Sequence, residues 1–162
     1  MKYILLLILF QFSQSCSSDS GLYKKSDSFV NHLLKAPVTP WSEINNAGSD
    51  YALLNSNTKS IFLFNSSCRK YESGTLTTLT ASILAGIEQA VILERKNVFY
   101  QEREAAEVTA SGNTDGIIRY FKIITIQKNN CIYDYILIST NKKNLEKDYS
   151  SLKIFLERII LI

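Results

Sequence analysis

Three cysteines and one histidine carry the main chemical options of this 162-residue sequence. A zinc site uses thiolate and imidazole ligands, often as closely spaced cysteine pairs, and a nucleophilic cysteine needs a neighbouring base and a lowered pKa. The cysteines stand far apart at positions 16, 68 and 131, and His32 lies near the N-terminus. We therefore predict no metal, no cofactor and no catalytic residue, with a surface or packing role for His32.

Cys16 follows a short apolar segment. Lys2 supplies a positive charge, Ile4–Phe10 has no polar residue, and small or polar residues lead to Ser15 and Cys16. This order is typical of a secretory signal, and the apolar run is far shorter than the roughly 20 residues that span a bilayer. A cysteine directly after the cut indicates a bacterial lipoprotein. Residues 1–15 are thus a predicted signal peptide, with cleavage after Ser15 and lipid on Cys16.

Ordinary secretion is the alternative to lipidation. Ser13 and Ser15 match the small-x-small pattern of signal-peptidase cleavage, and Ser13 and Gln14 depart from the usual lipoprotein pattern. The Ser-rich stretch after Cys16 favours lipidation, because an anchored domain needs a flexible, solvated tether. Residue 17 is Ser rather than Asp, which by the rule known for enteric bacteria favours the outer membrane of the cell envelope. A secreted or periplasmic protein remains the other possibility.

Export gives the two remaining cysteines a role. Disulfides form in the oxidising periplasm, and Cys68 and Cys131 each adjoin a β-like run, so they could meet across a sheet. We predict a Cys68–Cys131 disulfide. The alternative is two separately buried thiols that behave as small apolar residues.

Asp134 is the most unusual acidic residue, because it stands between Tyr133 and Tyr135 in an aromatic strand. A buried carboxylate needs a partner, and Arg103 or Arg119 could supply it. We therefore predict a candidate polar site at Arg103 and Asp134. The same position also suits a carboxylate that is satisfied locally and has no function.

Three further carboxylates lie close together at Glu102, Glu104 and Glu107. On a strand, 102 and 104 share one face and 107 points to the other. We interpret all three as part of a solvated strand face with cross-strand partners rather than as acid–base catalysts.

The charge balance excludes nucleic acid as an expected partner. The net charge is +3, and loss of the signal peptide removes only Lys2 and leaves +2. Basic residues are scattered, with no run longer than Lys24-Lys25 or Lys142-Lys143, whereas nucleic-acid binding needs a clustered basic patch. The expected partners are the membrane, through the N-terminal lipid, and another envelope protein.

Apolar periodicity predicts two main helices and a β-sheet. The helices cover residues 75–93 and 144–159, with Ser73 or Thr75 capping the first and Asn144 the second. Strand-like runs bounded by turn compositions cover 51–54, 60–64, 97–101, 102–111, 117–127 and 131–139. The predicted fold class is α+β: an antiparallel β-sheet with two main helices packed on it.

The domain organisation follows from these elements. Residues 16–40 are predicted to be the lipidated Cys and a flexible tether that contains a short helix-like segment, Asp27–Lys35, with apolar residues at 29, 30, 33 and 34. This segment ends before Pro37, as expected of residues preceding a proline. A single α+β domain is expected over residues 41–162.

Several short motifs are shared with known proteins. The arrangement resembles the PsbP/Mog1-like fold, a curved antiparallel sheet sandwiched by helices, and residues 41–160 resemble a group of uncharacterised bacterial lipoproteins. In those sequences a Gly often stands where this chain has Glu102. The resemblance implies a lipoprotein of unknown role and transfers neither photosystem nor GTPase binding. The matching pieces are Trp41, Cys68, Leu76-Thr77-Thr78-Leu79, Arg103-Glu104-Ala105, Asp115-Gly116 and Cys131-Ile132-Tyr133-Asp134-Tyr135.

These features favour a non-catalytic, lipid-anchored envelope lipoprotein that binds or helps to assemble another envelope component. The alternative is a periplasmic small-ligand or lipid-binding protein, which would need an apolar cavity between sheet and helices. A hydrolase is the third hypothesis and would need a pocket with a nucleophile and a base within reach.

Overall fold

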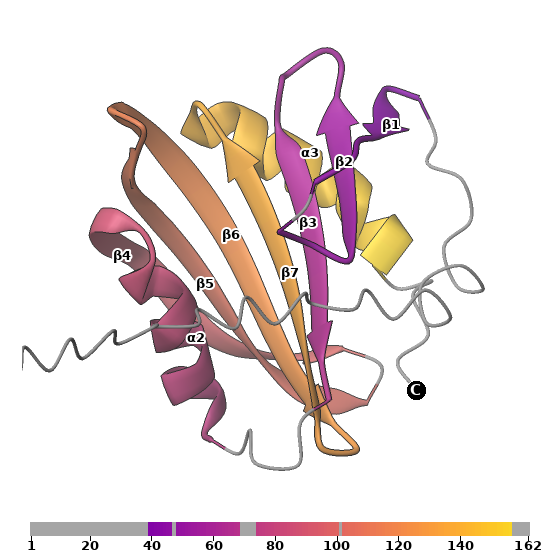
Figure 1. Ribbon diagram of the computed structural model, residues 1–162, viewed down its shortest axis with the longest axis vertical. Helices are drawn as coiled ribbons and strands as arrows, with labels where there is room; N and C mark the ends of the chain where they lie inside the picture. The colour runs from indigo at the N-terminus through magenta and orange to yellow at the C-terminus, as the bar shows by residue number, and fades with distance from the viewer. Residues whose placement is uncertain (1–38, 47, 69–73, 101, 157–162) are drawn as a thin grey trace, which may run out of the picture.

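The computed structural model describes residues 39–46, 48–68, 74–100 and 102–156, with side chains up to Lys153 (Figure 1). The predicted signal peptide, Cys16, His32 and the Asp27–Lys35 segment lie outside the described residues. The predictions made for them therefore stay predictions.

Seven antiparallel strands form one sheet in the order β1-β2-β3-β7-β6-β5-β4, which confirms the predicted α+β class. Each strand after β4 pairs with the strand that precedes it, and β7 then pairs with β3. The strands are β1 (Trp41–Glu43), β2 (Tyr51–Asn55), β3 (Ile61–Ser67), β4 (Glu88–Tyr100), β5 (Arg103–Thr114), β6 (Ile117–Lys128) and β7 (Cys131–Ser139).

Two helices cover opposite faces of this sheet. α2 (Leu76–Ala85) lies in front of the strands in Figure 1 and α3 (Lys142–Leu156) lies behind them. Alternation along the strands supplies a separate apolar core for each helix. The larger core, under α3, includes Phe62, Tyr133 and Leu145, and the smaller core, under α2, includes Leu84 and Ile123.

The first predicted helix is wrong in its second half. α2 ends at Ala85, and the chain continues as the long strand β4. Gly86 caps the helix end: its N–H donates to the carbonyl of Ile83 at 3.1 Å, and the N–H of Ile87 donates to that of Leu84 at 3.0 Å. The apolar residues after Gly86 fit both the helical and the strand period, and β-branched residues among them favour the strand. At the other end of α2 the predicted cap is confirmed, because Thr75 Oγ1 accepts from the N–H of Thr78.

The cap of α3 is three residues earlier than predicted. The Asn141 side chain accepts a hydrogen bond from the N–H of Asn144 at 2.8 Å, and the Asn141 carbonyl accepts from Leu145 at 3.1 Å. Asn141 is therefore the N-cap, and Asn144 lies in the first turn of the helix.

The predicted disulfide is present. It joins Cys68, just after β3, to Cys131, the first residue of β7, and these strands are neighbours in the sheet. Cys68 is therefore not a free thiol, which removes it as a nucleophile.

The turn between β4 and β5 has a backbone conformation that glycine adopts readily. Glu102 has a φ of 62°, in the left-handed region where glycine has no steric cost. The chain keeps the turn with a residue for which this backbone conformation is less favourable.

Gly112 on β5 allows the connection from α2 to β4 to pass close to the β5 backbone. A Cβ atom at this position would stand 2.4 Å from Cγ2 of Ile87 and 3.0 Å from the carbonyl oxygen of Glu88. The close approach fixes how β4 joins the edge of the sheet.

Candidate functional site

Asp134 finds its partner on the neighbouring strand. Its Oδ1 accepts a hydrogen bond from the Thr125 hydroxyl of β6 at 2.8 Å, and the two residues are paired in register. Arg103 lies exposed at the start of β5, and the register of that strand places Ala106, not Arg103, level with Thr125. A functional role for Arg103 and Asp134 therefore stays a prediction.

Arg119, the other partner considered for Asp134, lies far from it. It pairs with Gly112 on β5, six residues along β6 from Thr125. At about 3.3 Å per residue, that separation is about 20 Å. Arg119 therefore cannot be the partner of Asp134.

The interpretation of Glu107 as a solvated carboxylate is wrong, because its side chain is only 3% exposed. It lies on the α3 side of β5 and accepts from Lys122 Nζ of β6 at 3.2 Å and from Lys96 Nζ of β4 at 3.0 Å. The Lys122 side chain is equally buried, at 4% exposed, and its ammonium lies 4.9 Å from the centre of the Tyr149 ring. A buried ion pair therefore joins three strands beneath α3.

A chain of hydroxyl groups extends this ion pair into the helix. Tyr149 of α3 donates to Glu107 Oε2 at 2.7 Å, so the hydroxyl of Tyr100, 2.7 Å from that of Tyr149, acts as the donor to it. Tyr100 is the last residue of β4. The network thus connects α3 to the outermost strand of the sheet, and sequence reasoning missed it.

The electrostatics of the network favour the charged carboxylate. Burial alone would raise the pKa of Glu107, but the hydrogen bonds from Tyr149 and Lys96 and the charge of Lys122 outweigh it and hold that pKa below its usual range. Burial, followed by the hydrogen bonds to Tyr100 and Glu107, raises the pKa of Tyr149. Both groups therefore keep one protonation state at neutral pH, which suits a structural link rather than proton transfer.

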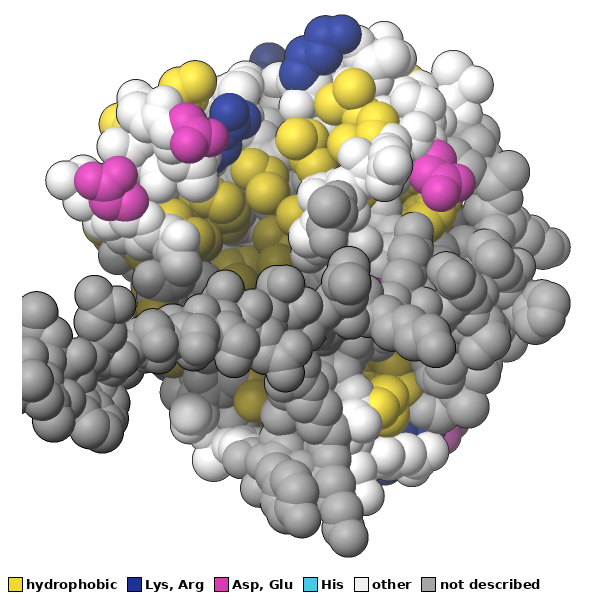
Figure 2. All heavy atoms as spheres, in the orientation of Figure 1, with side chains coloured by type: hydrophobic (Ala, Val, Ile, Leu, Met, Phe, Trp, Pro, Cys, Tyr) yellow, Lys and Arg dark blue, Asp and Glu magenta, His cyan; other side chains and the backbone are white. Residues whose placement is uncertain are grey.

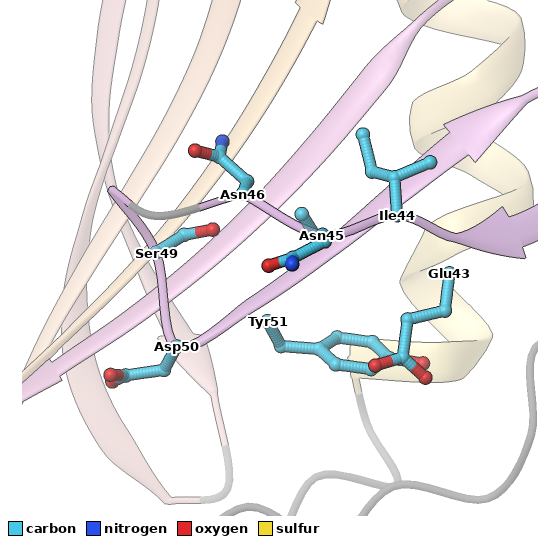
Figure 3. Close-up of a pocket in the computed structure, with 8 residues that line it drawn as sticks. Glu43, Ile44, Asn45, Asn46, Ser49, Asp50 and Tyr51 are labelled. Carbon is cyan, nitrogen blue, oxygen red and sulfur yellow. The ribbon is translucent and has the colours of Figure 1, made fainter. Parts of the chain in front are cut away.

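The loop between β1 and β2 frames a cavity of about 400 Å³ (Figure 3). Its lining is mostly polar and includes Glu43, Asn45, Asn46 and Asp50. The Asp50 carboxylate is already engaged, since it accepts from both the N–H and the hydroxyl of Ser66 at 2.6 and 2.7 Å. An apolar lining, which lipid or drug-sized ligands require, is not found in this cavity.

Large exposed apolar side chains are concentrated on the edge strand β4 and at the start of β6. Among the described residues they occur only on β4 and on the first two residues of β6: Val91, Ile92, Leu93, Phe99, Ile117 and Ile118. Phe99 is the most exposed of them, at 78%. We call these six residues the β4-edge patch. Val91, Ile92 and Leu93 are consecutive, whereas Phe99 lies about 20 Å farther along β4. The patch is therefore a line of exposed apolar residues along the edge strand, and such residues can mark an interaction surface.

The backbone of β4 offers a second means of recognition at this edge. Among the described strands, β4 has β5 as its one neighbour, so no described strand pairs with its other side. Register irregularities interrupt the first half of the strand, between Glu88 and Val91 and between Ile92 and Glu94. From Glu94 to Tyr100 the pairing is continuous, which is the regular backbone that strand addition uses.

The described residues hold neither a metal-binding cluster nor a membrane-spanning helix. Among them, no group of three or more His, Cys, Asp or Glu side chains is placed to hold a metal ion. In the same residues, no helix has the length and apolar character needed to cross a membrane.

Comparison with known proteins identifies the fold but not the family. No family model and no curated protein matches the sequence. The protein PA94 of unknown function from Pseudomonas aeruginosa matches over 67% of this chain and 78% of its own, with a TM-score of 0.55 and 7% identity. The cyanobacterial PsbP protein, CyanoP, from Synechocystis sp. PCC 6803 matches over 76% and 80%, with a TM-score of 0.51 and 10% identity. The fold is therefore PsbP-like, as the sequence predicted, and at these identities the likeness extends to the fold alone.

Proposed function

We propose that this protein is a non-catalytic, lipid-anchored envelope protein whose domain binds another envelope protein through the β4 edge. The β4-edge patch is the observation that carries the proposal. Its partner is a polypeptide segment that adds as a strand beside Glu94–Tyr100, with main-chain hydrogen bonds giving affinity and apolar side chains giving specificity. Phe99 is its central anchor, because exposed aromatic side chains often dominate binding energy.

The disulfide supports the location that this function requires. Structural disulfides persist in oxidising compartments such as the periplasm, so the Cys68–Cys131 bridge accords with an exported domain. Lipid on Cys16 would hold the domain at the membrane, and the several acyl chains of a bacterial lipoprotein give stable attachment. Mass spectrometry of the mature N-terminus tests the anchor: a lipid-modified Cys16 supports it, and an unmodified Cys16 would replace it with a secreted protein.

The binding role is tested by crosslinking in intact envelopes. We compare the wild-type chain with Phe99→Ser and with the matched control Lys147→Ser, which changes an exposed residue of α3. A specific partner should be captured by the wild type and by the control, and lost from Phe99→Ser. Equal capture by all three chains would show that the β4 edge is not the binding surface.

The small-ligand and hydrolase hypotheses find less support in the described residues. The cavity in Figure 3 is polar, and Cys68 is oxidised. The absence of catalytic activity nevertheless stays a prediction.

A further inference from the structure

Coverage of the sheet on the α2 side stops partway across it. α2 packs on β5 and β6 with Val108, Phe121 and Ile123 in its core. Ile136 and Ile138 of β7 lie at the margin of this core and are only partly buried. Beyond them, Leu54 of β2 and Ile61 and Leu63 of β3 are half-buried, whereas the apolar side chains on the other face of these strands are buried.

These half-buried side chains form a continuous apolar surface. Ile61 of β3 pairs with Ile138 of β7, and Leu63 with Ile136. Leu54 of β2 continues the first of these rows, because it pairs with Ile61. We call the five half-buried residues the α2-side hollow, and Figure 2 shows apolar side chains gathered in a hollow on this side of the molecule.

The opposite face of the same strands is fully covered. Phe62 and Phe64 of β3 and Tyr135 and Leu137 of β7 are buried in the core under α3. Strands that carry apolar residues on both faces belong inside a sheet covered on both sides. The α2-side hollow is therefore a surface built to be covered.

We propose that the segment Asp27–Lys35 of this chain packs on the α2-side hollow as an amphipathic helix. Its four apolar residues, at positions 29, 30, 33 and 34, fall on one side of a helix. Nine residues of helix are about 13.5 Å long, enough to extend across β3 and β7, which lie about 5 Å apart. This inference is independent of the proposed function, since it concerns one face of β2, β3 and β7 and not the β4 edge.

The covalent connection permits this arrangement. Trp41 of β1 pairs with Asn55 of β2, so the chain enters the sheet beside the row that contains Leu54, Ile61 and Ile138. β3 lies two strands from β1 and β7 lies three, which corresponds to about 10 and 15 Å. Pro40 is held beside β2, because its carbonyl accepts from the N–H of Ser56 at 2.9 Å. The three residues from 36 to 38 can span up to about 11 Å, and the helix itself extends farther across the strands. The segment can therefore reach the hollow without any rearrangement of the sheet.

Photo-crosslinking of the full-length chain tests the contact directly. A benzophenone amino acid replaces Leu63 in the hollow or, as a control, Phe99 on the β4 edge. Trypsin cuts after Lys25 and Lys35, so the segment is recovered as one peptide, residues 26–35. We expect the probe at position 63 to join this peptide within the same chain, and the probe at position 99 to leave it free.

An equal mixture of isotope-labelled and unlabelled chains distinguishes other occupants of the hollow. Crosslinks between the two labels would assign the hollow to a second copy and overturn the proposal. Attachment of the probe at position 63 to lipid, to another protein or to nothing would also overturn it.

Limited proteolysis gives a second test that needs no probe in the sheet. Leu33→Asp with Leu34→Asp should release the segment and increase the rate of cleavage after Lys35 at least about ten-fold, since a factor of ten corresponds to about 1.4 kcal/mol. The control, Ser28→Asp with Asn31→Asp, adds the same charge on the opposite side of the predicted helix. Equal cleavage rates in the two double variants would contradict the proposal.

Discussion

The two edge strands of the sheet differ in length and in exposure. At one edge, β1 is only three residues long, and its Trp41 is buried in the core under α3. At the other edge, β4 runs for 13 residues, and most of its side chains are exposed. Short edge strands discourage pairing with other chains. The contrast accords with the proposal that the β4 edge is the one that binds a partner.

A buried carboxylate on α3 reinforces the β1 edge. Asp148, which is 2% exposed, accepts from Asn55 Nδ2 at 3.0 Å and from the Thr58 hydroxyl at 2.6 Å. Asn55 Oδ1 in turn accepts from the N–H groups of Asn57 and Thr58. α3 thereby fixes the turn between β2 and β3. The corresponding link at the other edge is the Glu107 network. It joins α3 to β4 through Tyr149, Tyr100 and Lys96 and leaves the outer side of β4 unbound by described strands.

Removing the Glu107 side chain, which links α3 to β4, should have the largest effect on the free energy of unfolding. Glu107→Ala leaves Lys122 buried without its partner, and we expect a loss of about 3–5 kcal/mol in the free energy of unfolding. Denaturant titration measures it. Glu104→Ala, which changes an exposed side chain on the other face of β5, is the control and should lose less than about 0.5 kcal/mol. Similar losses in the two variants would refute the assigned role of Glu107.

Removing the Asp148 side chain, which links α3 to the β2–β3 turn, should lower the free energy of unfolding by a somewhat smaller amount. Asp148→Ala removes two hydrogen bonds to a carboxylate, and we expect a loss of about 2–3 kcal/mol. Hydrogen exchange should accelerate in β1 and β2 before it does in β4. Glu146→Ala, an exposed neighbour on α3, is the matched control. Loss confined to β4 would contradict the division between the edges.

Acid should weaken the link to the β4 edge by a smaller amount. The pKa of Glu107 is lowered in the folded chain, so its stabilising contribution is present above the unfolded pKa of about 4.5 and is lost as pH falls through the folded value. The free energy of unfolding of Glu107→Gln, measured from pH 7 down to pH 3, should therefore decline less steeply than that of the wild type. Parallel curves would show that Glu107 does not contribute to the acid dependence.

Removing the exposed anchor should have the smallest effect on folding. Phe99→Ser changes a side chain that is 78% exposed, so the free energy of unfolding should stay within about 0.5 kcal/mol of the wild type. Partner capture in envelopes should nevertheless be lost. Substantial unfolding of this variant in a denaturant titration would mean that Phe99 serves the fold rather than recognition.

The sequence predicted much of the sheet but misassigned its β4 edge. Apolar strands bounded by turn compositions, such as β7, are recognisable from the sequence, and the disulfide follows from export and an even cysteine pair. The stretch from Ile87 to Leu93 matched a helical period after a true helix. Only Gly86 indicated the end of that helix, and a single glycine inside a helical pattern is a weak stop signal.

The Glu107 network was hidden because its members are distant in sequence. Lys122 and Tyr149 lie 15 and 42 residues from Glu107, so no local spacing brings them together. One signal was available: Lys122 interrupts an apolar strand between Phe121 and Ile123. A charge in such a strand requires a buried partner, and an acidic residue on a neighbouring strand could have been sought.

A ladder of photo-crosslinks along β4 tests the central claim most directly. Probes replace Arg95, Asn97 and Phe99 in turn, which lie on the same side of the continuous part of the strand, and Ser42 on the β1 edge as the control. In intact envelopes we predict adducts from the three β4 probes to one partner segment, at positions that step by two residues, as an added strand requires. Scattered adducts, or equal capture at Ser42, would contradict the account.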